Sequence, residues 1–145
     1  MAAFAMIRRP GMTSTLWLAQ WNEKWKSFNF IGGHKEESES FRECIVREIE
    51  EELHIVPGRD FSIDNEPLSH LEYGAWSESA GAETQYCMEL FDITLHCDIP
   101  TFPMNETSPN RWLSEQEIRE NRCSDGKVVS KTMSLLLSKA SLWSN

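Results

Sequence analysis

The first third of the chain alternates hydrophobic and polar residues in short runs that predict strands. Three such runs precede the first glycine pair, over Ala2–Arg8, Thr15–Ala19 and Ser27–Ile31. Arg9-Pro10-Gly11 separates the first two runs as a turn signal. The polar and aromatic stretch Trp21–Lys26 separates the second and third and is predicted to be a loop. This part of the chain therefore predicts a sheet-forming region that ends at Gly32-Gly33.

The hydrophobic period changes to that of a helix after Ser40. Apolar side chains recur every four residues along one face, at Phe41, Ile45, Ile49 and Leu53. Ser40 with Glu43 three residues later forms a capping-box pattern, which marks the first turn of this helix. Pro57-Gly58 marks the end of the segment.

Two further strands are predicted in the second half of the chain. They cover Leu68–Trp76 and Thr84–Cys97 and are joined by the small, polar loop Ser77–Glu83. The apolar positions of the second strand change parity between Leu90 and Phe91. That change predicts a bulge or a bend.

Helices follow these strands. Pro100–Pro109 is a proline-rich loop, and Ser114 with Glu117 forms a second capping box that opens a short helix. A last helix is expected from about Lys127, with one apolar face made of Val129, Met133, Leu136, Leu137 and Ala140. The order of strands, helix, strands and helices predicts an α/β fold, an α/β/α sandwich with a mixed sheet.

Size and charge narrow the class of protein. With 145 residues, of which 40% are hydrophobic, the chain is expected to form a single domain over residues 1–145. The net charge of -9 leaves no fold-wide basic surface, so duplex nucleic acid is not an expected partner. No apolar run is long enough to cross a bilayer, and Met1–Arg9 lacks a basic leader. A membrane association and a signal peptide are therefore not expected.

The four cysteines carry no metal or disulfide pattern. Cys44, Cys87, Cys97 and Cys123 show no C-x-x-C pairing and no accompanying histidine spacing. A zinc site and a disulfide framework are therefore not expected, and the cysteines are interpreted as thiols in a reducing cytoplasm.

The glutamates of the predicted helix are the informative feature. At about 100° per residue, Glu48, Glu51 and Glu52 project into an arc of roughly 100° on the margin of the apolar stripe. Carboxylates placed there repel one another and lose solvent, so they require a counter-charge. Arg47 is near in sequence, but its angle places it beside Glu51 and away from Glu52. Glu-rich surface helices are common, so the alternative is a solvated acidic face; the flanking sequence favours a site for Mg²⁺ or Mn²⁺.

That flanking sequence resembles the signature of the Nudix hydrolases. The chain carries Gly33-x5-Glu39-x7-Arg47-Glu48-Ile49-x-Glu51-Glu52-x-His54-Ile55, and the family pattern is G-x5-E-x7-R-E-U-x-E-E-x-G-U, where U is a bulky aliphatic residue. Every specified position matches except the second glycine, which is His54 here. A residue after a helix often takes a left-handed conformation, and histidine is among the residues enriched there. We therefore expect His54 to bring modest strain without loss of the site.

The resemblance implies roles for these residues. Glu48, Glu51 and Glu52 would be carboxylate metal ligands, with the Gly32 carbonyl oxygen completing the set. Glu39 and Arg47 would brace the loop–helix–loop, and Gly33 would allow close approach to metal and phosphate.

Two further roles are assigned from position. The general base would be a glutamate of this helix or a loop carboxylate, with Glu106 as the first loop candidate and Glu83 as the second; either is also consistent with a plain surface residue. For the substrate, Trp25 could stack on a base and Lys24 could meet a phosphate, the alternative being that Trp21 or Trp25 packs against the sheet edge.

The resulting hypothesis is a cytoplasmic Nudix-type pyrophosphohydrolase. It would use Mg²⁺ or Mn²⁺ to hydrolyse a phosphoanhydride bond in a nucleoside diphosphate linked to another moiety, a small-molecule, nucleotide-type substrate. The alternative is a Nudix-fold module that senses or binds a nucleotide without turnover. Homodimers are frequent in the family, but no segment specifies an interface.

Overall fold

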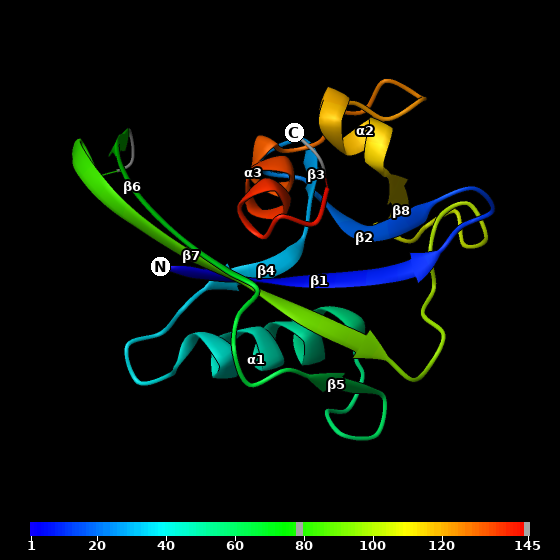
Figure 1. Cartoon of the computed structure of the whole chain (residues 1–145), viewed down its shortest axis with the longest axis horizontal. Coiled ribbons are helices and arrows are strands. Elements are labelled where there is room, and N and C mark those ends of the chain that lie inside the picture. The colour runs from blue at the N-terminus through cyan, green and yellow to red at the C-terminus, as the bar shows by residue number, and fades with distance from the viewer. Residues whose placement is uncertain (78–79, 144–145) are drawn as a thin grey trace.

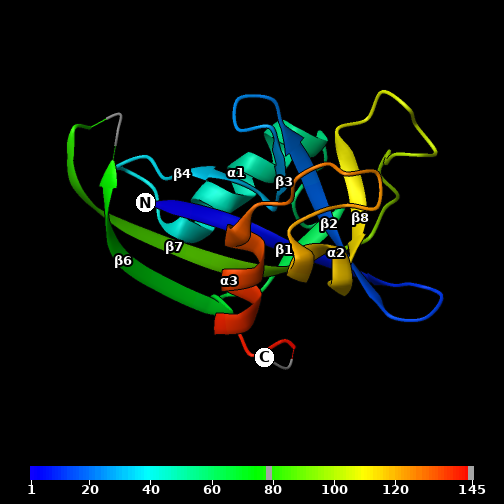
Figure 2. The same cartoon turned by 90° about the horizontal axis from the view of Figure 1, so that it is seen from above.

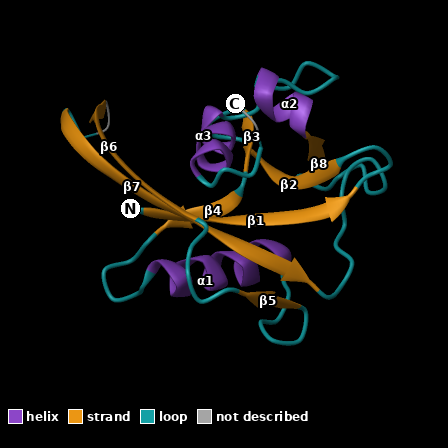
Figure 3. Ribbon diagram, in the orientation of Figure 1, coloured by secondary structure: helices purple, strands orange, loops and turns teal. Residues whose placement is uncertain are grey.

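The computed structural model describes residues 1–77 and 80–143 and places them in a mixed sheet with helices on both faces (Figures 1 and 3). The strands are β1 (Ala2–Pro10), β2 (Thr15–Asn22), β3 (Ser27–Asn29), β4 (Ile31–His34), β5 (Phe61–Ile63), β6 (Ser69–Ser77), β7 (Ala82–Leu95) and β8 (Asn110–Ser114). The helices are α1 (Phe41–Leu53), α2 (Glu115–Glu120) and α3 (Lys131–Lys139). The predicted α/β/α sandwich is confirmed. Positions 78–79 of the predicted loop 77–83 lie outside the described residues.

β1 organises the sheet. It pairs in parallel with β7, from Ala2 opposite Met88 to Ile7 opposite Ile93. Its first residues pair antiparallel with β4, and its last residues pair antiparallel with β2. β2 pairs with β3 and β8, which lie beside it in Figure 2, and β7 pairs with β6 and β5. The signature segment, which begins in β4 and continues through α1, is thus anchored on the central strand.

The middle of the long strand β7, from Cys87 to Ile93, carries buried side chains on both faces of the sheet. Phe91 and Ile93 pack with the apolar stripe of α1 on one face, and Met88 and Leu90 pack with α3 on the other. The register of β7 with β1 keeps one constant offset, so the bulge predicted from the change of parity is wrong. The parity changes because α1 and α3 cover different faces of the same strand.

Other boundaries also differ from the prediction. Residues 27–34 form two strands, because β3 pairs with β2 whereas β4 pairs with β1. α3 begins at Lys131, four residues after the predicted start, with Ser130 as its N-cap. Before it the backbone runs along β3, where Phe28 N–H donates to the Val128 carbonyl at 2.9 Å and Ser130 N–H to the Phe28 carbonyl at 2.8 Å. Val129 is therefore buried in the segment that pairs with β3, and it is not a residue of the helix.

Among the described residues, no helix is long and apolar enough to cross a membrane.

Candidate functional site

α1 begins and ends as its sequence predicts. Ser40 Oγ accepts from Glu43 N–H at 3.1 Å, and Glu43 Oε1 accepts from Ser40 N–H at 2.9 Å, which completes the capping box. His54 ends the helix in the left-handed region, with φ 56 and ψ 42, and its N–H donates to the Glu50 carbonyl at 3.0 Å. The histidine therefore takes the conformation expected at this position.

The glycine pair lies in close contact with β1 on one side and α1 on the other. A Cβ on Gly32 would overlap the Ala3 carbonyl oxygen. A Cβ on Gly33 would overlap the Glu48 carboxylate and lie 2.6 Å from its Cδ. The absence of a side chain thus lets the Glu48 carboxylate pack against the β4 backbone.

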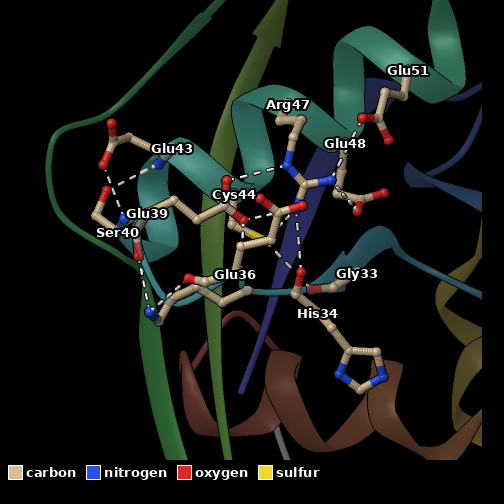
Figure 4. Close-up of polar contacts among 11 residues, drawn as sticks. Gly33, His34, Glu36, Glu39, Ser40, Glu43, Cys44, Arg47, Glu48 and Glu51 are labelled. Carbon is tan, nitrogen blue, oxygen red and sulfur yellow. Dashed lines mark hydrogen bonds and ion pairs between the residues drawn. The ribbon is translucent and has the colours of Figure 1, made fainter.

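Arg47 connects the loop to the helix (Figure 4). Its Nε and Nη2 donate to the two Glu39 oxygens at 3.1 and 2.7 Å, and its Nη1 donates to Glu48 Oε1 at 3.0 Å. Nη2 also donates to the His34 carbonyl at 3.2 Å, and Nη1 lies 3.5 Å from Glu51 Oε1. A planar guanidinium can hold several oxygens at once, so one side chain fixes the loop and orients two carboxylates.

The loop before α1 closes around Glu39. Glu36 N–H donates to Glu39 Oε1 at 2.9 Å, and Lys35 Nζ donates to the Glu39 carbonyl at 2.9 Å. Hydrogen bonds from Arg47, and next from the Glu36 N–H, lower the pKa of Glu39 to about 2. Glu39 therefore stays ionised and keeps its bonds to Arg47 over the whole neutral range.

Glu48 is the desolvated member of the three helix glutamates. Its side chain is 13% exposed, whereas that of Glu51 is 57% exposed and Glu52 lies on the surface. Burial raises the pKa of Glu48, and the charges of Glu51 and Glu52 raise it further, against the opposing effect of Arg47. A buried carboxylate beside two others, with its one cation shared with Glu39, has the donor chemistry that a hard divalent cation requires.

The residues assigned to the substrate lie apart from this network. Trp25 is 70% exposed in the turn between β2 and β3, and Lys24 Nζ lies 5.2 Å from the centroid of its ring. Trp21 packs edge-on against Phe28 with ring centroids 5.1 Å apart, as the sheet-edge alternative predicted. Trp21 and Phe28 both line a hollow of about 310 Å³, whereas Lys24 and Trp25 do not.

Glu106 lines the same hollow. Phe102, Arg111 and Lys127 also line it and add an aromatic ring and two positive charges. Arg111 Cζ lies 4.8 Å from the Phe28 ring centroid and 4.5 Å from that of Phe102, and Lys127 Nζ lies 4.9 Å from that of Trp21. These side chains come from β2, β3, β8 and two loops, so sequence analysis missed Arg111 and Lys127, which carry no local pattern. Glu83 lies on β7, outside this lining.

The chain was compared with known families and structures. The model of the NUDIX domain family matches residues 1–132. A search of curated proteins gave no match. The Ap4A hydrolase of C. elegans shares 18% identity at a TM-score of 0.64, over 97% of this chain and 95% of that one.

Two further structures show the same likeness. A Nudix hydrolase of Listeria monocytogenes shares 16% identity at a TM-score of 0.65, over 96% of this chain and 90% of that one. The NUDIX domain of Shewanella oneidensis NrtR, complexed with ADP ribose, shares 12% identity at a TM-score of 0.64, over 97% and 85%. At these identities the likeness shows a shared fold.

Proposed function

Because the chain belongs to the NUDIX domain family, we propose that it is a Nudix-type pyrophosphohydrolase that cleaves a phosphoanhydride bond in a nucleoside diphosphate linked to another moiety. The observation that carries this proposal is the Glu48 carboxylate, buried against Gly33 and held by Arg47 beside Glu51. Glu48, Glu51, Glu52 and the Gly32 carbonyl would hold Mg²⁺ or Mn²⁺.

The chain's own residues orient the reaction. A bound Mg²⁺ or Mn²⁺ would supply positive charge to the phosphate oxygens and acidity to the attacking water. Arg47 keeps Glu48 and Glu51 in place, and Glu39 keeps Arg47 in place. For the proton of the attacking water we propose a glutamate of α1 or, as the first loop candidate, Glu106. The Glu106 loop lines the hollow described above, so this role requires the reacting phosphate to lie within hydrogen-bond reach of that loop.

The hollow beside Glu106 suits the nucleoside part of the substrate. Trp21 and Phe28 offer aromatic faces, and Arg111 and Lys127 offer positive charge for a phosphate. Phe28 precedes Gly33 by five residues along β3 and β4, at most about 17 Å of extended chain. A nucleoside diphosphate linked to a second group can span that path. Lys24 and Trp25, on the neighbouring turn, would then contact the far end of the substrate.

A hydrolysis screen tests the function. Nucleoside triphosphates, dinucleoside polyphosphates, nucleotide sugars and dinucleotide coenzymes are incubated with Mg²⁺ or Mn²⁺, and the products are identified. From at least one class of substrate we expect metal-dependent release of a nucleoside monophosphate, together with a second phosphorylated fragment or pyrophosphate.

The same screen tests the alternative of a sensing module, which the NrtR domain complexed with ADP ribose favours. If no class gives product with either metal, while a nucleotide raises Tm, the chain binds without turnover.

The pocket assignment has its own test. Trp21→Ala should raise KM about tenfold with little change in kcat, because a stacking surface for the base is lost. Trp25→Ala is the comparison and should raise KM less, since Trp25 is exposed, lies outside the hollow and would contact only the far end of the substrate. A larger rise in KM for Trp25→Ala than for Trp21→Ala would instead assign nucleobase binding to Trp25, on the turn between β2 and β3.

We propose a cytoplasmic location for the protein, the prediction made from the spacing of the four cysteines, all of which are free thiols. Whether it forms a homodimer is tested by its mass in solution.

A further inference from the structure

A second group of metal-ligand side chains lies on the hairpin of β6 and β7, which extends away from the body of the molecule in Figure 1. His70 and Glu72 on β6 are directly opposite Glu89 and Cys87 on β7. Residues two apart on a strand point to the same face, so the register brings all four side chains together. Their sequence separation explains why the spacing of cysteines and histidines did not predict a zinc site.

Three of these ligand atoms already have the separations of a tetrahedral site. His70 Nε2 lies 3.1 Å from Glu72 Oε1 and 3.6 Å from Cys87 Sγ, and Cys87 Sγ lies 3.8 Å from Glu72 Oε1. Zinc bonds of about 2.3 Å to sulfur and about 2.1 Å to nitrogen and oxygen place tetrahedral ligands roughly 3.3 to 3.6 Å apart. The three atoms are within about 0.3 Å of that arrangement.

Glu89 holds the histidine in the required orientation. Its Oε2 lies 2.6 Å from His70 Nδ1, and its side chain is 16% exposed. A carboxylate that accepts from Nδ1–H leaves the lone pair of Nε2 for a metal, the usual arrangement around metal-bound histidines. Glu89 is thus a positioning residue for His70.

The donor set selects the ion. One thiolate, one imidazole and one carboxylate suit Zn²⁺, whereas Mg²⁺ prefers oxygen ligands. Without an ion, a protonated His70 would pair with Glu72 and Glu89, and the buried Cys87 thiol, a weak donor, would make only a long hydrogen bond of 3.8 Å to Glu72 Oε1. A cation at the centre satisfies all three ligand atoms at once.

We propose that Cys87, His70 and Glu72 bind Zn²⁺, with a fourth position open to water or an external ligand. Binding releases the Cys87 thiol proton, and any proton carried by His70 Nε2, to solvent. The ion would cross-link the two strands and fix the His70 ring, which packs edge-on against Phe41, the first residue of α1, at 6.3 Å between centroids. The proposal is independent of the hydrolysis reaction.

Cobalt spectroscopy tests the site directly. Metal-free protein is saturated with Mg²⁺ to fill oxygen-only sites and is then titrated with Co²⁺. A thiolate–cobalt charge-transfer band that saturates at one equivalent and is displaced by Zn²⁺ is expected. Absence of the band in the folded wild-type protein would overturn the proposal.

Variants assign the ligands. Cys87→Ser should abolish the band, and Cys97→Ser should retain it, because Cys97 lies ten residues further along, on the order of 30 Å away. Glu72→Gln should fold normally, because the Glu72 side chain is 60% exposed, and it should weaken zinc binding at least tenfold. An unchanged band in Cys87→Ser, or its loss in Cys97→Ser, would refute the assignment.

The positioning role of Glu89 is tested by Glu89→Gln. Zinc affinity should fall about 10- to 100-fold while the charge-transfer band keeps its shape, because the ligands remain. Unchanged affinity would show that Glu89 does not position His70.

Discussion

Helix α1 and the β6–β7 hairpin each gather carboxylates on one surface, but they do so by different means. On α1 the three glutamates lie within little more than one helical turn, and Arg47 from the same helix orients two of them. On the hairpin, residues 15 to 19 positions apart meet through the register of two strands. The first arrangement offers oxygen atoms alone, and the second adds nitrogen and sulfur. We infer that the donor atoms, and not the number of acidic residues, would select Mg²⁺ at the first region and Zn²⁺ at the second.

The two regions also differ in how firmly they are held. Glu39 and Glu48 are largely covered and share one guanidinium, which bonds to both. Glu72 and His70 are largely exposed, and their ion pair is open to solvent. We therefore expect changes on α1 to have large effects on activity and changes on the hairpin to have small ones.

Removal of divalent metal should have the largest effect. Chelation should reduce hydrolysis to background, and Mg²⁺ or Mn²⁺ should restore it equally in the wild type and in Cys87→Ser, because the helix site uses oxygen ligands. Initial rates before and after metal addition measure this. If Mg²⁺ failed to restore hydrolysis in folded Cys87→Ser, the two regions would have to act together in catalysis.

The second-largest effect on activity is expected for Glu52→Gln. We expect kcat to fall at least about a hundredfold with an almost unchanged Tm, since a ligand charge is lost without change in shape. Glu50→Gln is the control, because Glu50 is an exposed residue of the same helix at an unspecified position of the signature. Steady-state kinetics and thermal unfolding of both variants measure the difference. Normal turnover by Glu52→Gln would exclude it as a ligand.

Glu39→Gln should have a milder effect, about tenfold on kcat, because Glu39 acts through Arg47. Since the pKa of Glu39 is lowered from 4.5 to about 2, its ionised form stabilises the folded protein above about pH 4.5, and this contribution is lost as the pH falls toward 2. The variant should therefore lose less stability than the wild type over this range, as Tm against pH will show. Complete loss of kcat with an unchanged backbone would contradict a bracing role.

His70→Gln in zinc-free protein should have the smallest effect. The His70 ring is 43% exposed and its ion pair with Glu72 is open to solvent, so the free energy of unfolding should fall by about 1 kcal/mol or less, with kcat unchanged. Urea unfolding in the presence of a chelator measures this. A loss of several kcal/mol would mean that the ion-pair network, even without metal, supports the fold.

Much of α1 was predictable because its signals are local. The capping box at Ser40, the apolar period and the left-handed His54 depend on neighbours within one or two turns. The proximity of Arg47 to Glu51 follows from helical geometry in the same way. Arg47 makes shorter contacts with Glu39 and Glu48. These depend on how closely the loop before α1 packs against the helix, which the helical pattern alone does not predict.

The sequence by itself determined the family signature, the sandwich architecture and which glutamates share one face of α1. The tertiary structure decided the split of residues 27–34 into two strands, the start of α3 and the burial of both faces of β7. It also decided the contact of His70 with Cys87 and the placement of Trp21 and Glu106 around one hollow. Helix geometry repeats every few residues and can be read along the chain, whereas strand register and loop packing join distant segments, so those contacts exist only once the sheet has formed.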